Sequence, residues 1–108
     1  MAEADKAVVD YFKPENMAYI NIANKISIDC DCDANPKDPE MKDIGIFASL
    51  DPVAIDQCCY DTIINSSDVG KESLVERMKE KHAIHTVERA CELGIGNREY
   101  ELINIDNE

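Results

Sequence analysis

Residues 43–61, DIGIFASLDPVAIDQCCYD, join a short apolar run to the start of a helix. The run at 43–50 is almost continuously apolar or small, which is typical of a strand covered on both faces. Asp51 and Pro52 then favour a helix start, because a carboxylate caps the first amides and proline suits the first helical position. The sequence therefore predicts a strand that leads directly into a helix over residues 52–67, the central unit of an α/β fold.

Elements of the same two kinds are expected on either side of this unit. Upstream, MAYINIANKISI (residues 17–28) alternates apolar and polar side chains, which predicts a strand with one apolar face. Downstream, a helical stretch closes at Gly94 and leads to a last strand, REYELINID (residues 98–106). A strand, helices and another strand imply a right-handed crossover with parallel pairing. The other expected segments are a helix at 3–13, a polar loop at 29–43, and helices at 71–82 and 83–94.

Together these elements predict an α/β (or α+β) fold with a small three-stranded mixed or parallel sheet and three to four helices. A length of 108 residues is enough for one small domain and too short for two. A strand buried on both faces needs more cover than so few elements supply. We therefore expect residues 1–108 to form either a single domain or a segment of a larger α/β domain.

The composition disfavours several classes of function. A net charge of −12 argues against nucleic acid and against anionic membrane surfaces. The chain has no apolar run of membrane-spanning length, and its first ten residues lack the features of a signal peptide. We therefore expect a cytoplasmic protein whose thiols stay reduced, with no nucleic-acid or membrane partner. Its five cysteines, an odd number, argue against a complete disulfide framework.

The loop SIDCDCDANP (residues 27–36) places two thiols, Cys30 and Cys32, among three carboxylates. Neighbouring negative charge disfavours the thiolate that binds metal, so these thiols make sense as ligands only with a cation present. That cation would be soft, either Zn²⁺ or the iron of a cluster. Two sulfurs do not complete a tetrahedral site. The further ligands we consider are Asp29, Asp31, Asp33 and Cys59, since Cys58 fits the core better. The alternative is two reduced cysteines in a solvated acidic loop.

The same loop also has the spacing of a calcium-binding EF-hand. Counted from Asp29, oxygen-bearing side chains fall at positions 1, 3, 5, 7 and 12. The match fails because Ala34 replaces the glycine that the sharp turn needs, because Pro36 and Pro39 interrupt the loop, and because a strand precedes it. The acidic spacing therefore does not predict calcium binding.

Two further carboxylates, Asp51 and Asp56, belong to the motif SLDPVAID. Asp51 is explained by its position as a helix cap, whereas Asp56 has no basic residue three or four positions later to pair with. Ligands bind beyond the carboxyl ends of strands in open α/β sheets, so Ser49, Asp51 and the cysteine loop are expected to converge there. Both Asp51 and Asp56 are candidate metal ligands. We find no catalytic triad order and no phosphate-binding glycine loop, so any enzymatic activity stays open.

The chain resembles a known family in three places: AYINIANKISIDCDCD (residues 18–33), DIGIFASLDPVAIDQCCYD (43–61) and LGIGNREYELINI (93–105). The family is that of the uncharacterised iron–sulfur-centre proteins, a domain-of-unknown-function family, and the resemblance runs from about residue 3 to residue 106. It implies an α/β domain two to three times this length, of which the chain is similar to the C-terminal segment. No C-x₂-C-x₂-C run is present, so a ferredoxin-type cluster is not expected.

Two functional hypotheses follow. In the first, the chain binds an iron–sulfur cluster or zinc through Cys30 and Cys32, with Cys59 as a further ligand, and serves a redox or electron-transfer role in the full-length protein. In the second, the chain is a purely structural segment that holds no metal. The expected partner is the N-terminal part of its own domain or a redox protein. An enzyme using Asp51 and Asp56 around a metal ranks third.

Overall fold

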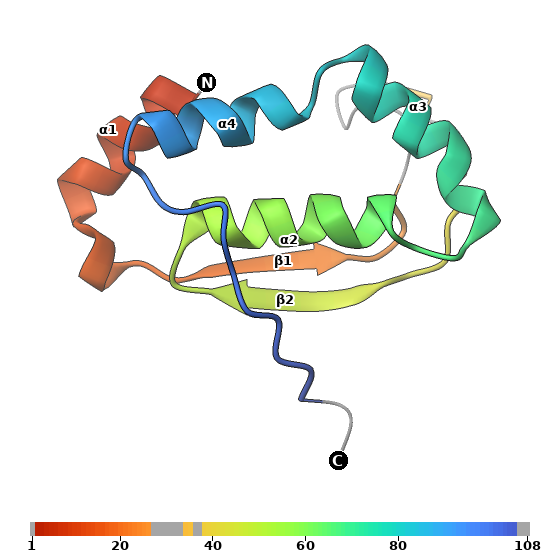
Figure 1. Cartoon of the computed structure of the whole chain (residues 1–108), viewed down its shortest axis with the longest axis horizontal. Helices are drawn as coiled ribbons and strands as arrows, with labels where there is room; N and C mark the ends of the chain where they lie inside the picture. Colours follow the sequence, from red (N-terminus) through yellow and green to blue (C-terminus); the bar gives the residue numbers. More distant parts are fainter. Residues whose placement is uncertain (1, 27–33, 36–37, 106–108) are drawn as a thin grey trace.

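The structure of the chain is a computed structural model that describes residues 2–26, 34–35 and 38–105 (Figure 1). Its helices and strands, in chain order, are α1 (Ala2–Phe12), η1 (Pro14–Asn16), β1 (Tyr19–Ala23), β2 (Gly45–Ser49), α2 (Pro52–Ile64), η2 (Val69–Lys71), α3 (Glu72–Glu80) and α4 (Ile84–Glu92). Among these described residues, no helix is long and apolar enough to cross a membrane. The expected combination of helices with a small sheet is confirmed.

The expected three-stranded mixed or parallel sheet is wrong. The described residues form a two-stranded sheet in which β1 and β2 are antiparallel, with Tyr19 opposite Ser49 and Ala23 opposite Gly45. No described helix lies between these two strands, so the chain makes no crossover there and returns in the opposite direction. Residues 100–105, expected as a strand, belong to no regular element. Side-chain contacts to α2 hold the start of this segment, so it does not pair with the sheet.

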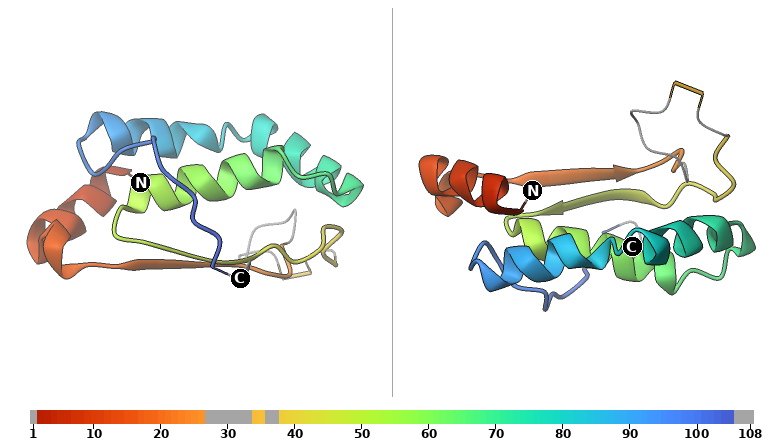
Figure 2. Two further views of the ribbon diagram at one scale, coloured as in Figure 1. Left: turned by 60° about the horizontal axis from the view of Figure 1, so that its bottom comes forward. Right: turned by 90° about the horizontal axis from the view of Figure 1, so that it is seen from above.

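The sheet lies on one side of α2 and α4 lies on the other (Figure 2), and α1 packs against α4. Helix α2 contributes more buried residues than any other described element, because it packs against both the sheet and α4. Its buried residues are Val53, Ala54, Ile55, Gln57 and Cys58. Val9 of α1 and Val87 of α4 are buried on the outer side of the same core. The prediction that Cys58 belongs to the core is confirmed.

The two ends of the helical unit follow the local sequence signals. The Asp51 carboxylate accepts hydrogen bonds from the amides of Val53 and Ala54, at 2.9 and 3.1 Å, so it caps α2 as predicted. At the end of α4, Gly94 adopts a φ of 77°. The Ile95 amide then donates to the Ala90 carbonyl at 3.1 Å, which closes the helix in the way expected of a glycine.

The apolar face of β1 is not covered by the described residues. Ile20 and Ile22 of β1 and Ile46 of β2 are 68%, 66% and 69% exposed on the face of the sheet opposite α2. The alternation in the sequence therefore predicted the strand correctly, but α2 packs on its other face, which carries Tyr19, Asn21 and Ala23. A two-stranded sheet with an apolar outer face gains little stability from the hydrophobic effect on that side.

Candidate functional site

The cysteine loop is closed at its base by contacts between residues on either side of it. The Lys25 amide donates to Asp43 Oδ1 at 2.6 Å, and the Ile44 amide donates to the Ala23 carbonyl at 2.8 Å. Near the second end of the loop, Met41 is buried. The residues that enter and leave the loop are therefore held together. Asp29, Cys30, Asp31, Cys32 and Asp33 lie outside the described residues, and their assignment as metal ligands stays a prediction.

A carboxylate of the following turn fixes the same base. Asp68 Oδ2 accepts from the Lys42 amide and Asp68 Oδ1 accepts from the Gly70 amide, both at 2.8 Å. These two backbone hydrogen bonds favour the charged form and hold the pKa of Asp68 below its ordinary value. The loop exit is thus tied to the segment between α2 and α3, a contact that no sequence pattern indicated.

Asp51 does not meet the cysteine loop at one edge of the sheet. Because the strands are antiparallel, β2 ends at Ser49, opposite Tyr19, and Asp51 follows there, whereas the loop leaves β1 at the opposite end, beyond Ala23. The prediction that Ser49, Asp51 and the cysteine loop converge at one edge of a parallel sheet is therefore wrong. In addition, the second oxygen of Asp51 accepts from the Asn97 amide at 2.9 Å, so both of its carboxylate oxygens are already hydrogen-bonded.

Asp56 and Cys59 come together on α2 around a residue of β1. The Asn21 side-chain amide donates to Asp56 Oδ1 at 2.9 Å and to Cys59 Sγ at 3.5 Å. Burial raises the pKa of the Cys59 thiol, and its hydrogen bond from Asn21 only partly opposes this effect. The thiol is therefore kept neutral at pH 7. No sequence pattern indicated a role for Asn21, apart from its position as a polar residue on the face of β1 that α2 covers.

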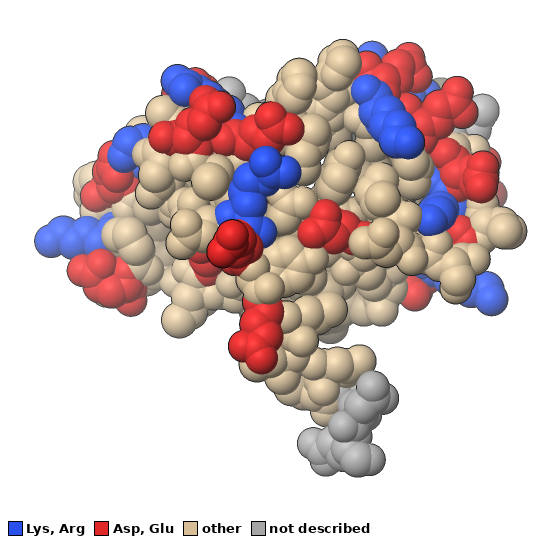
Figure 3. Space-filling model, viewed as in Figure 1, with Lys and Arg blue, Asp and Glu red and all other residues tan. Residues whose placement is uncertain are grey.

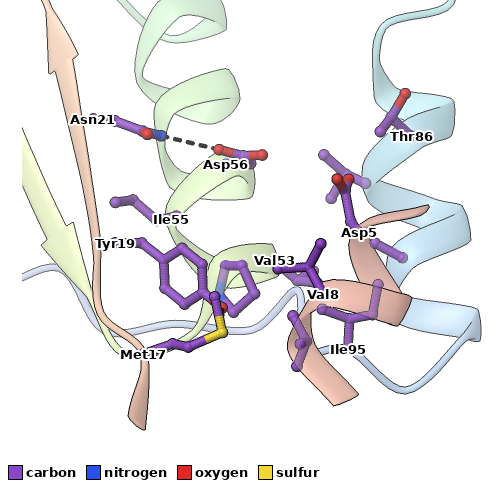
Figure 4. A pocket seen from close by; sticks show the side chains of 14 residues that line it. Asp5, Val8, Met17, Tyr19, Asn21, Val53, Ile55, Asp56, Thr86 and Ile95 are labelled. Atoms are coloured by element: carbon purple, nitrogen blue, oxygen red, sulfur yellow. Dashed lines mark hydrogen bonds between the residues drawn. The ribbon is translucent and has the colours of Figure 1, made fainter. Parts of the chain in front are cut away.

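A cavity of about 310 Å³ lies beside this group, between α1, β1, α2 and α4 (Figure 4). Its walls are mainly apolar, and in Figure 4 Asp5, Asp56 and Thr86 lie at one end of it while Met17 and Ile95 lie at the other. No Lys, Arg or His lines it, so its charge favours a cation over an anion. The full lining is Asp5, Val8, Val9, Met17, Tyr19, Asn21, Pro52, Val53, Ile55, Asp56, Thr86, Val87, Ala90 and Ile95.

The described residues do not build a metal site by themselves. No group of three or more His, Cys, Asp or Glu side chains in that part of the chain is placed to hold a metal ion. Asp51 precedes α2 as its N-cap and both of its oxygens accept backbone amides, whereas Asp56 lies within α2 and accepts from Asn21, so the two carboxylates have separate partners. A metal site would therefore depend on ligands from residues 27–33.

Comparison with known proteins supports one part of the resemblance, the membership of an uncharacterised family; the link to iron–sulfur centres and the C-terminal placement stay predictions. The fold is that of an α/β protein in which one long helix lies against a small antiparallel sheet. The family described as "Domain of unknown function (DUF362)" matches residues 1–61, more than half of the 108 residues, and the chain belongs to this family. The match covers α1, both strands, the cysteine loop and most of α2. Neither a curated protein nor a solved structure matches the chain.

Proposed function

We propose that this chain binds a soft metal ion, either Zn²⁺ or the iron of a cluster, through Cys30 and Cys32. In the full-length protein the site would serve a redox or electron-transfer role. The observation that supports this proposal is the closed base of the loop, where the Lys25 amide lies 2.6 Å from Asp43 Oδ1. A loop with fixed ends loses less conformational entropy when two of its side chains bind one ion.

The remaining ligands are proposed from the chemistry of the nearby residues. Asp29 and Asp31 flank the two thiols in sequence and would supply oxygen. Cys59 is the sequence-distant candidate, and it would have to lose its proton and its hydrogen bond from Asn21. Asp56 is an exposed residue, and its Oδ1 accepts a hydrogen bond from the Asn21 side-chain amide, so it too is proposed as an oxygen ligand. Asp51 is the weakest candidate, since coordination would break the cap of α2.

Anaerobic reconstitution tests this proposal. The chain would be loaded with iron and sulfide, and separately with zinc, and bound metal and visible absorption would be measured after desalting. We expect the Cys30→Ser/Cys32→Ser double variant to lose nearly all bound metal, and Cys59→Ser to lose part of it. Cys91→Ser, on α4, is the matched control and should bind as the parent does. If the double variant keeps as much metal as the parent, the loop is not the site.

The exposed face of the sheet favours a second candidate function. Three isoleucines lie on one continuous surface that is open to solvent in the described residues. We propose as the alternative that this chain is a structural segment of a larger α/β domain, in which the rest of the domain covers this face. The fluorescence of a dye that binds exposed apolar surface tests it. Ile22→Thr and Ile46→Thr should each reduce dye binding. Adding the rest of the larger domain as a separate polypeptide should cover the face and suppress dye binding to the parent.

A further inference from the structure

The cavity between α1, β1, α2 and α4 has an apolar interior. Its volume of about 310 Å³ is about twice that of an engineered cavity of roughly 150 Å³ that binds one benzene molecule. The Tyr19 hydroxyl donates to Met17 Sδ at 3.5 Å, so the polar atom of this aromatic side chain already has a partner. The lining includes the buried aliphatic residues Val9, Val53, Ile55 and Val87. The interior therefore suits the apolar body of a small organic ligand.

One end of the cavity, formed by Asp5, Asp56 and Thr86, has polar groups that can accept hydrogen bonds. These residues come from α1, α2 and α4 and are exposed, so this acidic end opens to solvent (Figure 4). The side chains of Asp5 and Thr86 have no partner in the described part of the chain. Asp56 Oδ1 accepts from Asn21 at 2.9 Å, and Figure 4 shows the other oxygen of Asp56 on the side of Asp5. The acidic end therefore has acceptors to spare.

Basic side chains do not neutralise the acidic end. Among the described lining residues there is no Lys, Arg or His. Lys6, next to Asp5 in sequence, pairs with Asp10 at 3.0 Å, and Arg89 of α4 pairs with Glu3 at 2.8 Å. Figure 3 shows the same arrangement more widely, since on this face most Lys and Arg side chains lie next to Asp or Glu. The unpaired carboxylates at the cavity therefore favour a positively charged ligand group.

An inorganic cation does not match this cavity. Ca²⁺ takes about six to eight oxygen ligands, and Mg²⁺ keeps several of its waters, which apolar walls cannot replace. Within the described residues, no group of three or more His, Cys, Asp or Glu is placed to hold a metal ion. An ammonium group on an apolar body fits better. Its three N–H donors need only a few acceptors, and its body gains free energy by leaving water.

We propose that this cavity binds a small primary amine with an apolar body, of the arylalkylamine class. The ammonium group donates hydrogen bonds to Asp5, to the second oxygen of Asp56 and to Thr86. The apolar body lies against the buried aliphatic side chains of α1, α2 and α4. This inference does not rest on the proposed metal site, because Asp5, Thr86 and the apolar lining are not candidate metal ligands.

An NMR titration of the full chain in metal-free buffer at pH 7 tests this proposal. The probes are 2-phenylethylamine, 2-phenylethanol and phenylacetate, which share one ring and differ in charge. We expect the amine to bind with a Kd of about 1 mM or lower, at least about tenfold more tightly than the alcohol or the carboxylate. The largest amide shifts should fall in α1, β1, α2 and α4. Ethylamine, which lacks the ring, should bind at least about tenfold more weakly than 2-phenylethylamine.

Four variants locate the two parts of the ligand. Asp5→Asn and Asp56→Asn should each weaken binding of the amine at least about fivefold and leave binding of the alcohol within about twofold. Ala90→Leu places a larger side chain in the cavity and should weaken binding of both probes at least about tenfold. Glu76→Gln is the matched control, because it removes a carboxylate from α3, outside the lining, and should leave both affinities within about twofold.

Several results would overturn the proposal. Equal affinities for the three phenyl probes would show that the cavity does not select a cation. Amine binding that both Asp5→Asn and Asp56→Asn leave within about twofold would place the ammonium group elsewhere. Shifts confined to α3, or no binding up to about 20 mM amine, would also exclude this site. The two carboxylate variants change exposed side chains without changing their size, so they test the proposal even if Ala90→Leu does not fold.

Discussion

The Asp51 carboxylate joins the start of α2 to the segment after α4. Its Oδ1 accepts from the Val53 amide at 2.9 Å, and its Oδ2 accepts from the Asn97 amide, 46 residues away in sequence, at 2.9 Å. A residue expected as a helix cap and as a candidate metal ligand therefore has a second structural partner. The contact also sets where residues 98–105 begin to cross α2 and β2.

Replacing Asp51 tests this double contact. Asp51→Ala should lower the free energy of unfolding by about 2 kcal/mol, the sum of a lost cap and a lost hydrogen bond. Asp51→Asn keeps a good capping side chain and should cost less than about 1 kcal/mol. Urea unfolding followed by circular dichroism measures both values. Equal costs for the two variants would show that capping is not the main contribution.

Gly96 makes room for the same carboxylate. A Cβ atom at this position would collide with Oδ1 of Asp51 and with the rest of its carboxyl group. Gly96→Ala should therefore destabilise the parent by an amount similar to Asp51→Ala, because the side chain must leave its two partners. In the Asp51→Ala background the same change should cost much less, since the colliding group is absent. Additive effects in this double-mutant cycle would contradict the proposed collision.

The Asp68 carboxylate makes the stability of the loop base depend on pH. Its pKa is lowered in the folded state by hydrogen bonds from the Lys42 and Gly70 amides. A lowered pKa means that the stabilisation is present above the unfolded value of about 3.9 and is lost as pH falls through the folded value. The difference in unfolding free energy between the parent and Asp68→Asn should therefore shrink below about pH 4. A difference in unfolding free energy that stays at its pH 7 value below about pH 4 as well would contradict the prediction.

Cys59 should react slowly with alkylating agents. Burial raises the pKa of its thiol, and the nearby Asp56 carboxylate adds to this shift. Asp56→Asn removes the negative charge, so it should lower the pKa of Cys59 and speed its alkylation at pH 8, by about twofold. Mass spectrometry of the alkylated peptides measures each cysteine separately. Asp10→Asn, on α1, is the control and should leave the rate at Cys59 unchanged.

Local signals in the sequence predicted several elements correctly. Asp51 followed by Pro52 placed the start of α2, and Gly94 placed the end of α4, because capping depends only on residues within one or two turns. The alternation around Ile20 and Ile22 predicted β1 for the same reason. The prediction of parallel pairing was wrong, since strand direction depends on the path of the chain between the strands, which local periodicity does not encode.

The candidate site was predicted only in part for a related reason. Thiols and carboxylates can be recognised by type, so the sequence predicts the loop with Cys30 and Cys32 as a candidate site, and this stays a prediction because residues 27–33 lie outside the described residues. The grouping of Asn21, Asp56 and Cys59 was not, because it requires a strand and a helix 35 or more residues apart to pack together. The second partner of Asp51 was missed in the same way.

From the sequence alone, the start of α2, the end of α4, the presence of β1 and β2 and the residues with metal-binding chemistry could be predicted, whereas the strand expected at residues 98–106 was wrong over the described residues 98–105. These properties depend on the intrinsic preferences of each residue and of its neighbours along the chain. Packing between distant segments sets three further features: the strands run antiparallel, α2 covers the face of Asn21 and leaves the isoleucines exposed, and residues 100–105 lie outside the sheet. Each of these outcomes depends on contacts between residues far apart in the sequence, whose energies no local pattern contains.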